Sequence, residues 1–462
     1  MKKKVTALLL AAVLAMGMTA CAGGGAGNSE KSSSSGGSGS SRQEDNSSGG
    51  NTAAELKALT TEEIKAAIKA EAEANGNSIQ LKVWVPENES GSDDFVNCYK
   101  QRFNEFIELY GDTSYELKVG AAIKNMSLTP SDIIEKYDNA ADVMIISASD
   151  LSVLKEKERI AEAELAYYGK GMDTFIDEAA ASVRFDGTQY AYPVYYDSCF
   201  LVYDKNVYTD PADTASLDSL IAKAAENNKS FYYDIEDPWQ GSAFLLTAGV
   251  PMTADEEKTT VGFETDEALS AYRSIADYGR YVGSGLKTYT TENEIGAKKA
   301  KSIDIGDEYA AYIAASCDLK GLSPDNIGVA KLPTARINGE QQQLETFGEL
   351  FCLAIKKDTA FPKTAQALAA FLSEPEFLGR VRDEVTAFVP LREYENTEAI
   401  KAVKEQLPYM HSIRGKVNAN YWGCGIGDFC AWLLQKNTEL TDEMIREEIP
   451  KRIMPETGMK AS

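Results

Sequence analysis

Apolar residues recur along this chain with two spacings that alternate from segment to segment. Between Thr60 and Asn75 they fall on one face of a helix, and Glu63 completes a capping box with Thr60, so a helix is predicted there. Residues 79–85 alternate apolar and polar side chains, which predicts a strand. The patterns continue as helices over 95–110 and around 133–134, and as strands over 115–119 and 141–146. This alternation favours a mostly parallel sheet covered by helices on both faces.

The same alternation begins again further along the chain. Asp186-Gly187 predicts a hairpin turn between two short strands, and another strand is expected over 199–204. Beyond residue 205 the expected elements are a helix over 216–227, a strand over 230–233, a long helix over 265–281 and a strand over 327–334. Two such blocks imply an α/β fold of two lobes with a cleft between them.

The first fifty residues have a different pattern. Three lysines, a short apolar run over 5–16 and small residues ending in Cys21 form an export signal. The apolar run is shorter than the roughly 20 residues that a membrane-spanning helix needs. Residues 22–50 are almost all Gly, Ser, Asn and charges, a composition that stays disordered and has a typical reach of roughly 30 Å. A chance cysteine after an ordinary secretion signal is the alternative.

Composition excludes several classes of function. The net charge of −24 argues against nucleic acid or an anionic membrane surface as the main partner. The single histidine, His411, leaves little support for zinc triads or Ser-His-Asp hydrolysis, and a surface role is expected for it. The seven cysteines are widely spaced. Cys199 and Cys352 lie in apolar runs and are expected to be buried, whereas a Cys424–Cys430 bridge stays open.

Four segments in this order carry a resemblance to a known family. They are Lys-Val-Trp-Val-Pro at 82–86, Ala-Asp-Val-Met-Ile-Ile at 141–146, the hairpin and strand over 185–205, and Ile-Gly-Val-Ala-Lys-Leu-Pro-Thr at 327–334. Together they resemble the solute-binding lipoproteins of bacterial ABC importers, of the maltodextrin-type carbohydrate-binding group, over nearly all of residues 78–440. Thr19-Ala20-Cys21 resembles the lipobox, whose cysteine is lipidated with diacylglyceryl and palmitate groups.

This resemblance implies a type II periplasmic-binding-protein-like fold with discontinuous lobes. The expected organisation is a signal peptide over 1–20, lipidated Cys21 with a tether over 21–53, an N-terminal helix over 54–77, one lobe over 78–195 plus about 346–395, and a second lobe over 196–345 plus about 396–462. The mature protein would then be extracytoplasmic and anchored to the cell membrane by the lipid on Cys21.

Sugars present hydroxyls at their edges and apolar faces, so a receptor uses aromatic platforms together with carboxylates or amides. The resemblance and the positions after predicted strands give a candidate ligand-binding set: Glu87, Asn88, Asp150, Tyr195, Tyr196, Asp197, Asp237, Trp239, Tyr421 and Trp422. For the tyrosines and Trp422 the alternative is core packing, and for Glu87, Asn88 and Asp150 it is solvated loop charge. Cys317 stands where many relatives have a tryptophan, which puts a malto-oligosaccharide as the particular ligand in doubt.

The expected function is capture of a carbohydrate, with an oligosaccharide as the expected ligand, and its delivery to an ABC importer permease through closure of the cleft. We expect no catalysis, no cofactor, no bound metal and a monomer. The alternatives are a surface glycan hydrolase, since acidic residues are abundant, a binding protein for another small solute, and a structural or adhesive lipoprotein.

Overall fold

The computed structural model describes residues 57–86, 94–124, 140–254, 259–288, 308–315, 326–385, 388–417, 419–436, 440–453 and 456–457. These belong to one compact unit over Ala54–Ser462. The predicted signal, Cys21 and the tether lie outside the described residues, as do Glu87, Asn88, the helix around 133–134 and Cys317.

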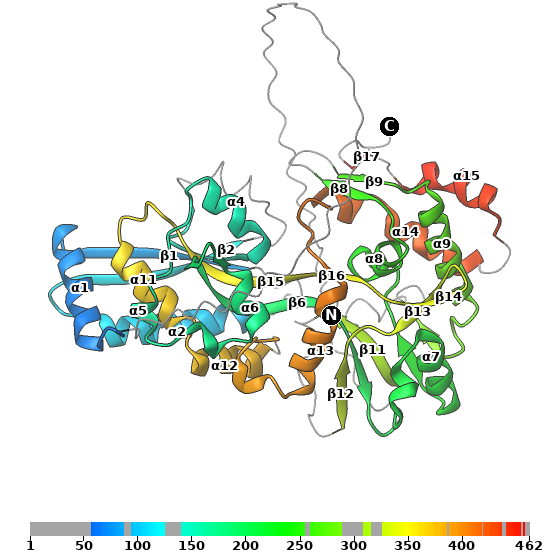
Figure 1. Ribbon diagram of the computed structural model, residues 1–462, viewed down its shortest axis with the longest axis horizontal. Helices are drawn as coiled ribbons and strands as arrows, with labels where there is room; N and C mark the ends of the chain where they lie inside the picture. Colours follow the sequence, from blue (N-terminus) through cyan, green and yellow to red (C-terminus); the bar gives the residue numbers. More distant parts are fainter. Residues whose placement is uncertain are drawn as a thin grey trace, which may run out of the picture. The chain divides into compact units, whose positions relative to one another are not determined.

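A ten-stranded sheet organises the unit, with its main path in the order β10-β7-β11-β6-β15-β3-β1-β2 (Figure 1). Its strands are β1 (Ser78–Pro86), β2 (Glu116–Lys124), β3 (Val143–Ser147), β6 (Ala191–Asp204), β7 (Ser230–Tyr232), β10 (Leu286–Lys287), β11 (Tyr309–Ala315), β12 (Ile327–Ala330), β15 (Thr346–Ile355) and β16 (Met410–His411). The smaller sheets contain β4 (Arg184–Phe185), β5 (Thr188–Gln189), β8 (Met252–Ala254), β9 (Thr259–Val261), β13 (Thr334–Ile337), β14 (Glu340–Gln343) and β17 (Glu456–Thr457).

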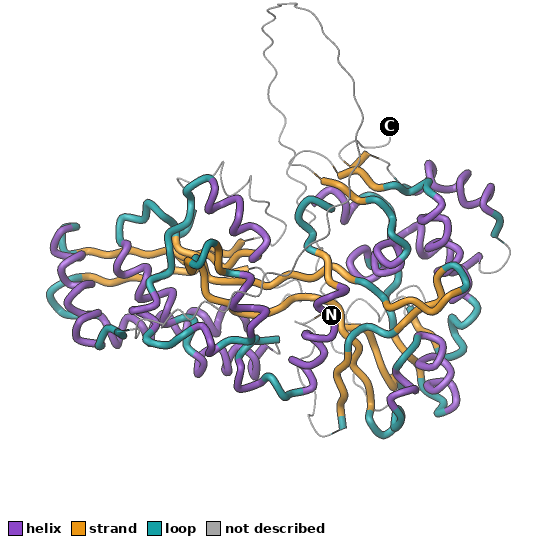
Figure 2. Tube along the Cα trace, in the orientation of Figure 1, coloured by secondary structure: helices purple, strands orange, loops and turns teal. Residues whose placement is uncertain are grey.

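Two strands join the halves of this sheet. β6 pairs antiparallel with β15 through its first part and with β11 and β12 through its second part. On the other side β15 pairs antiparallel with β3, whereas β1, β2 and β3 are parallel to one another. Figure 2 shows β6 and β15 running side by side between the two groups of helices. We call β6 and β15 the crossing strands.

The helices pack along both halves of the sheet (Figure 1). They are α1 (Thr61–Ala74), α2 (Asp94–Tyr110), α4 (Leu151–Glu156), α5 (Leu165–Tyr168), α6 (Asp177–Ser182), α7 (Leu217–Glu226), α8 (Pro238–Thr247), α9 (Asp266–Gly279), α11 (Pro362–Phe371), α12 (Pro375–Val385), α13 (Glu398–Gln406), α14 (Ile426–Lys436) and α15 (Asp442–Arg452). Short 3₁₀ turns include η2 (Ala148–Asp150), η9 (Leu407–Tyr409) and η10 (Ala419–Gly423).

Most locally encoded expectations are confirmed. Thr60 and Glu63 form the predicted capping box at the start of α1. Asp186 and Gly187 both have positive φ in the predicted hairpin turn. One prediction is too short: the strand expected over 199–204 begins at Ala191 and runs without a break as β6. Pro193 lacks an N–H, and the register opposite it shifts between Phe351 and Cys352, which lets the strand continue past the proline.

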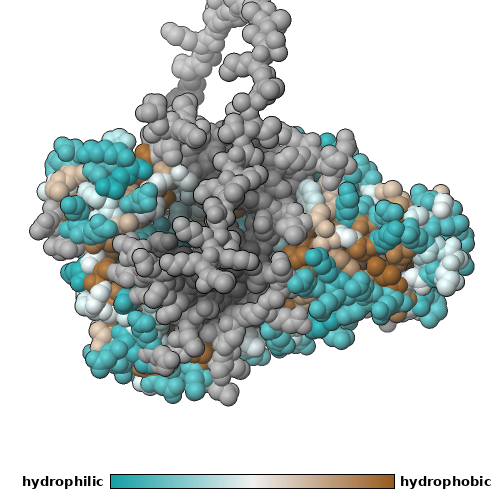
Figure 3. All heavy atoms as spheres, turned by 180° about the vertical axis from the view of Figure 1, so that it is seen from behind, coloured by the Kyte–Doolittle hydropathy of each residue, from teal (hydrophilic) through white to brown (hydrophobic). Residues whose placement is uncertain are grey.

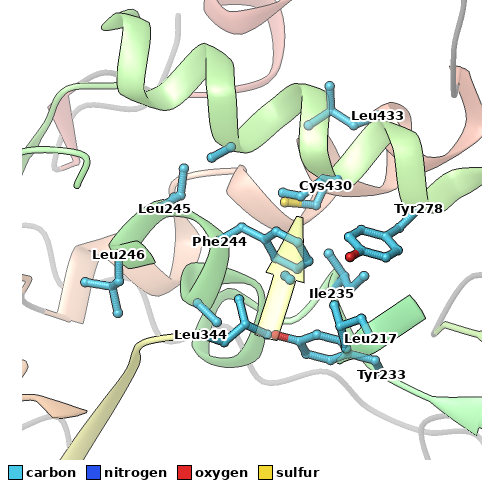
Figure 4. Packing of buried hydrophobic residues seen from close by; sticks show 14 of the residues in the cluster. Leu217, Tyr233, Ile235, Phe244, Leu245, Leu246, Tyr278, Leu344, Cys430 and Leu433 are labelled. Atoms are coloured by element: carbon cyan, nitrogen blue, oxygen red, sulfur yellow. The ribbon is translucent and has the colours of Figure 1, made fainter. Parts of the chain in front are cut away.

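Two large hydrophobic cores lie toward opposite ends of the crossing strands. One is built from segments within 64–195 and 351–391, and the other from segments within 199–347 and 417–453. Figure 4 shows part of the second core, where Phe244 of α8, Tyr278 of α9 and Cys430 of α14 pack together. A third cluster, which includes Phe200 and Cys352, fills the space along the crossing strands.

On the face that Figure 3 shows, the described surface is largely hydrophilic, and apolar residues gather in one area on the part at the right of the view. Leu109 and Met444 are the exposed large hydrophobic residues in the described ranges. No helix among the described residues has the length and apolar character required to cross a bilayer.

Candidate functional site

The crossing strands position the first group of predicted site residues. In their register, Tyr195 lies opposite Phe351, Tyr196 opposite Leu350 and Asp197 opposite Glu349. Tyr195 is buried and stacks on Phe351, with ring centroids 5.0 Å apart. Asp197 is partly exposed. Because neighbouring residues of a strand point to opposite faces, Tyr196 packs in a different cluster from Tyr195.

An aromatic group forms where α8, β15 and η10 meet; it consists of Trp239, Phe347, Tyr421 and Trp422. The ring centroids of Trp239 and Trp422 lie 5.7 Å apart, and each is 5.9 Å from the ring of Phe347. Phe347 and Tyr421 are fully buried, whereas both tryptophans are partly exposed. The Tyr421 hydroxyl is 2.7 Å from the Ser242 hydroxyl. The buried rings therefore support two tryptophans that are partly exposed, although Nε1 of Trp239 is itself buried.

Asp237 has a structural role that the sequence interpretation missed. It is the N-cap of α8, and its Oδ1 accepts hydrogen bonds from the backbone N–H groups of Trp239 (2.8 Å) and Gln240 (3.0 Å). The predicted loop of Asp237, Pro238 and Trp239 is thus the first turn of a helix. Burial raises the pKa of Asp237, although these two backbone hydrogen bonds act in the opposite direction. The hydrogen bond from the Trp239 N–H to Asp237 fixes the position of Trp239 in the first turn of α8.

Asp234 lies just before this cap and shares its environment. Its Oδ1 accepts a hydrogen bond from the backbone N–H of Asp237 at 3.1 Å. Burial, followed by the charges of Asp237 and Glu236, raises the pKa of Asp234 to about 7. This carboxyl group therefore changes its charge near neutral pH, in the segment just before α8 and Trp239.

Glu349 is a buried carboxylate at the centre of the crossing strands, and no motif had indicated it. It accepts hydrogen bonds from Ser147, from Ser149 (3.3 Å), from the Ser412 hydroxyl (2.6 Å) and from the Ile413 N–H (3.0 Å). Burial raises the pKa of Glu349, and these hydrogen bonds partly oppose the shift. The carboxylate links the end of β3 to the segment after β16.

A second link of the same kind lies beside it. Asp150, at the end of η2, accepts a hydrogen bond at 2.6 Å from Nη1 of Arg414. Only 9% of the Asp150 side chain is exposed, compared with 28% for Arg414. The carboxylate that was expected to contact ligand is therefore held in an ion pair between segments 264 residues apart in sequence.

A cavity of about 410 Å³ lies next to the crossing strands, and its polar lining includes Ser149, Glu178, Tyr196 and Glu349. The Tyr196 hydroxyl and Glu178 Oε2 are buried without a hydrogen-bond partner. Burial, then the charge of Glu178, raises the pKa of Tyr196, which keeps this phenol protonated. The structure thus separates Tyr196 from the aromatic group and places it at this cavity.

The cysteines and the histidine follow simple packing rules. Cys199 and Cys352 are buried as predicted, and Cys424 and Cys430 are buried free thiols rather than a bridge. The half-buried His411 pairs with Glu345, with 2.5 Å between Nε2 and Oε2. In the described part of the chain, no group of three or more His, Cys, Asp or Glu residues has the arrangement of a metal site.

Sequence signals for the two missed residues differ in strength. Glu349 is the one charged residue in an otherwise apolar or small strand, Thr346–Ile355, and such a position indicates a buried charge with partners. Arg414 has no comparable signal, because its partner lies far away in the chain. The structure brings together Asp150, Asp197, Glu349 and Arg414 near the crossing strands, and Asp237, Trp239, Tyr421 and Trp422 around the aromatic group.

Comparisons with known proteins agree with this architecture. Residues 105–405 match the family described as bacterial extracellular solute-binding protein. A structure solved with acarbose has a TM-score of 0.58 at 19% identity, covering 81% of this chain and 97% of that one. The maltodextrin-binding protein from L. casei BL23 without ligand has a TM-score of 0.54 at 17% identity, covering 81% and 97%.

A Thermus thermophilus maltotriose-binding protein bound with maltotriose has a TM-score of 0.55 at 13% identity, and the match covers 80% of this chain and 98% of that one. At these identities the likeness establishes the fold, a two-lobed type II periplasmic-binding-protein-like α/β architecture. A comparison with curated protein sequences gave no significant match.

Proposed function

This chain belongs to the family of bacterial extracellular solute-binding proteins, and we propose that it captures an oligosaccharide and delivers it to an ABC importer permease. The observation that carries the proposal is the aromatic group, in which two partly exposed tryptophans lie 5.7 Å apart on buried supports. Solved neighbours include proteins bound with acarbose, maltotetraose and maltotriose.

The chemistry of a sugar explains this choice of ligand. The apolar C–H faces of a pyranose ring pack against indole rings, and the hydroxyls around its edge form strong hydrogen bonds with carboxylates. Trp239 and Trp422 supply the stacking surfaces, and Asp197 and Asp237 supply acceptors in this proposal. Glu87 and Asn88 are assigned to the ligand on the resemblance alone, since they lie outside the described residues. Tyr195 and Tyr421 act through packing that holds these groups.

Delivery requires a conformational change that ligand favours. The crossing strands join the two cores, and a ligand that contacts both sides stabilises the closed arrangement by its additional contacts there. We propose that the lipid on Cys21 and the tether over 21–53 hold the receptor at the membrane that carries the permease. Replacement Cys21→Ser tests the anchor, because the exported variant should move from the membrane fraction to the medium.

Binding is tested by isothermal titration of the purified protein with maltotetraose, acarbose and a panel of mono- and oligosaccharides. We expect saturable binding of at least one oligosaccharide, and at least a tenfold loss for Trp422→Ala, because a stacked aromatic ring contributes about 0.5–1.5 kcal/mol beyond its area burial. Trp432→Ala is the matched control, since Trp432 packs against the same core but stacks on Phe429, at 5.6 Å between ring centroids, instead of on a ring of the aromatic group.

The proposal fails if the panel gives no binding while other small polar solutes do. It also fails if purified protein releases shorter products from the oligosaccharide, which would identify a glycan hydrolase instead. Both results are read from the same incubations, by titration and by chromatography of the sugar.

A further inference from the structure

Arg414 offers an unused pair of hydrogen-bond donors at the candidate site. Its Nη1 donates to Asp150 Oδ1 at 2.6 Å, and its backbone N–H donates to the Ser412 hydroxyl at 3.0 Å. Among the described residues, the side-chain hydrogen bond of Arg414 comes from Nη1, and neither Nε nor Nη2 donates one. These two nitrogens form one edge of the planar guanidinium group, the edge that binds two adjacent acceptors at once.

The surrounding contacts fix where this edge lies. The preceding residues are tied to Glu349, whose Oε1 accepts from the Ser412 hydroxyl and from the Ile413 N–H. After Arg414 the chain turns at Gly415, which has a φ of +69°, and the Gly415 carbonyl accepts from the Ala254 N–H at 2.9 Å. Arg414 therefore sits on a short turn held at both ends, and Asp150 fixes the orientation of its side chain.

This turn follows β16, the short strand that pairs with β15 at Phe347 of the aromatic group. His411 is the register partner of Phe347, whose ring lies 5.9 Å from each of the two tryptophans. Three residues after His411, the side chain of Arg414 reaches Asp150 at the end of η2. Arg414 thus connects the segment that follows β16, which pairs with β15 beside Phe347, to η2.

We propose that Arg414 is a ligand-binding residue whose free edge donates to two adjacent hydroxyl oxygens of a neutral sugar, and that Asp150 is its positioning residue. The inference rests on the proposed function and names a donor for it. A neutral ligand is favoured over an acidic one, because two carboxylates already lie beside Arg414. Asp150 is paired with its guanidinium group, and Glu349 accepts a hydrogen bond from Ser412, two residues before Arg414. A ligand carboxylate would face these like charges.

This assignment changes the role expected for Asp150. Asp150 is only 6% exposed, and its carboxylate is paired with the guanidinium group of Arg414. We therefore expect Asp150 to affect ligand binding by orienting Arg414. A residue that acts only through another has no additional effect once the other is removed, and a double-mutant cycle measures this directly.

The experiment titrates maltotetraose and the panel sugars into the full chain and its variants Arg414→Gln, Arg414→Lys, Asp150→Asn and the double variant. Lysine keeps the ion pair with Asp150 but lacks the second donor edge. We expect both Arg414 variants to bind about 10- to 100-fold more weakly, the range of hydrogen bonds to a charged group. Asp150→Asn should weaken binding in the wild-type background and have no further effect on Arg414→Gln.

The control is Arg273→Gln, which removes an exposed ion pair to Asp442 on α9 and α15 and should leave affinity unchanged. Melting temperatures of ligand-free proteins separate folding from binding, and Arg414→Lys should melt as the wild type does. If Arg414→Lys binds like the wild type, the ion pair alone matters and the donor role is overturned. If the double variant is weaker than Arg414→Gln, Asp150 contacts ligand itself.

These results are distinguishable from failure of the proposed function. When the wild type binds a sugar and Arg414→Gln binds it equally well, only the role of Arg414 is refuted. When the wild type binds no sugar of the panel, the proposed function fails and this inference falls with it.

Discussion

Removing the buried carboxylate of Glu349 should destabilise the protein in a way that depends on pH. Glu349 is 5% exposed and accepts hydrogen bonds from three serine hydroxyls and one backbone N–H. We consider two substitutions. Glu349→Gln keeps an oxygen that accepts from Ile413, whereas Glu349→Leu removes every acceptor and leaves a side chain of similar size.

The structure sets the magnitude of the effect. In the leucine variant, Ser147 and Ser149 can still bond each other, since their hydroxyls are 2.7 Å apart, and Ser412 still accepts from the Arg414 N–H. The Ile413 N–H is the donor left without a partner, at a cost of about 1–3 kcal/mol. With the lost hydrogen bonds to a charged acceptor, Glu349→Leu should cost about 2–4 kcal/mol, and Glu349→Gln about 1 kcal/mol.

The sign of the pH dependence follows from the pKa. Burial raises the pKa of Glu349 in the folded protein, so the folded state binds a proton more tightly than the unfolded state. The stability contributed by protonation is fully present below the unfolded pKa and is lost as pH rises through the folded pKa. Acidification from neutral pH therefore stabilises the wild type relative to both variants, and the difference in unfolding free energy grows.

Urea unfolding of the ligand-free proteins at pH 7 and pH 5, followed by tryptophan fluorescence, measures these differences. Glu340→Gln, an exposed position on β14, is the matched control and should leave the midpoint unchanged at both pH values. The reasoning is refuted if Glu349→Leu unfolds at the wild-type urea concentration, or if its deficit shrinks on acidification.

Two further predictions concern the second core. Burial raises the pKa of Asp234 to about 7, so the wild type should lose stability relative to Asp234→Asn as pH rises from 4 through 7. Melting curves across that range measure this, and a constant difference between the two proteins would contradict the prediction. Gly425 has a φ of +91°, and a Cβ there would lie 2.0 Å from the Arg452 carbonyl oxygen, so Gly425→Ala should lower the unfolding free energy by about 1–3 kcal/mol or more. The same urea assay checks this, with Gly423→Ala, which meets no atom within 4 Å, as the control.

Candidate-site residues could be predicted from the sequence when they follow the end of a predicted strand or belong to a local motif. Trp239 and Trp422 were selected separately, and their 5.7 Å contact arises from folding, since 183 residues separate them. Asp237-Pro238 before an apolar run is also a sequence signal for the start of a helix, with aspartate as the N-cap and proline at the first helical position. The capping role of Asp237 was therefore predictable from the sequence. The ligand set itself stays a prediction.

The sequence by itself determined the elements whose stabilising contacts are local. The Thr60–Glu63 capping box, the Asp186-Gly187 turn and the alternation of strand and helix involve residues a few positions apart, so the chain specifies them before it folds.

Only the tertiary structure decided which distant groups became partners. The continuity of β6 past Pro193 depends on its register with β15, and the ion pair of Asp150 with Arg414 depends on two loops meeting. Burial of Glu349 depends on donors from segments about 200 and 60 residues away. Such pairings follow from packing of the whole unit, because the free energy of a buried charge is set by what surrounds it and not by its neighbours in sequence.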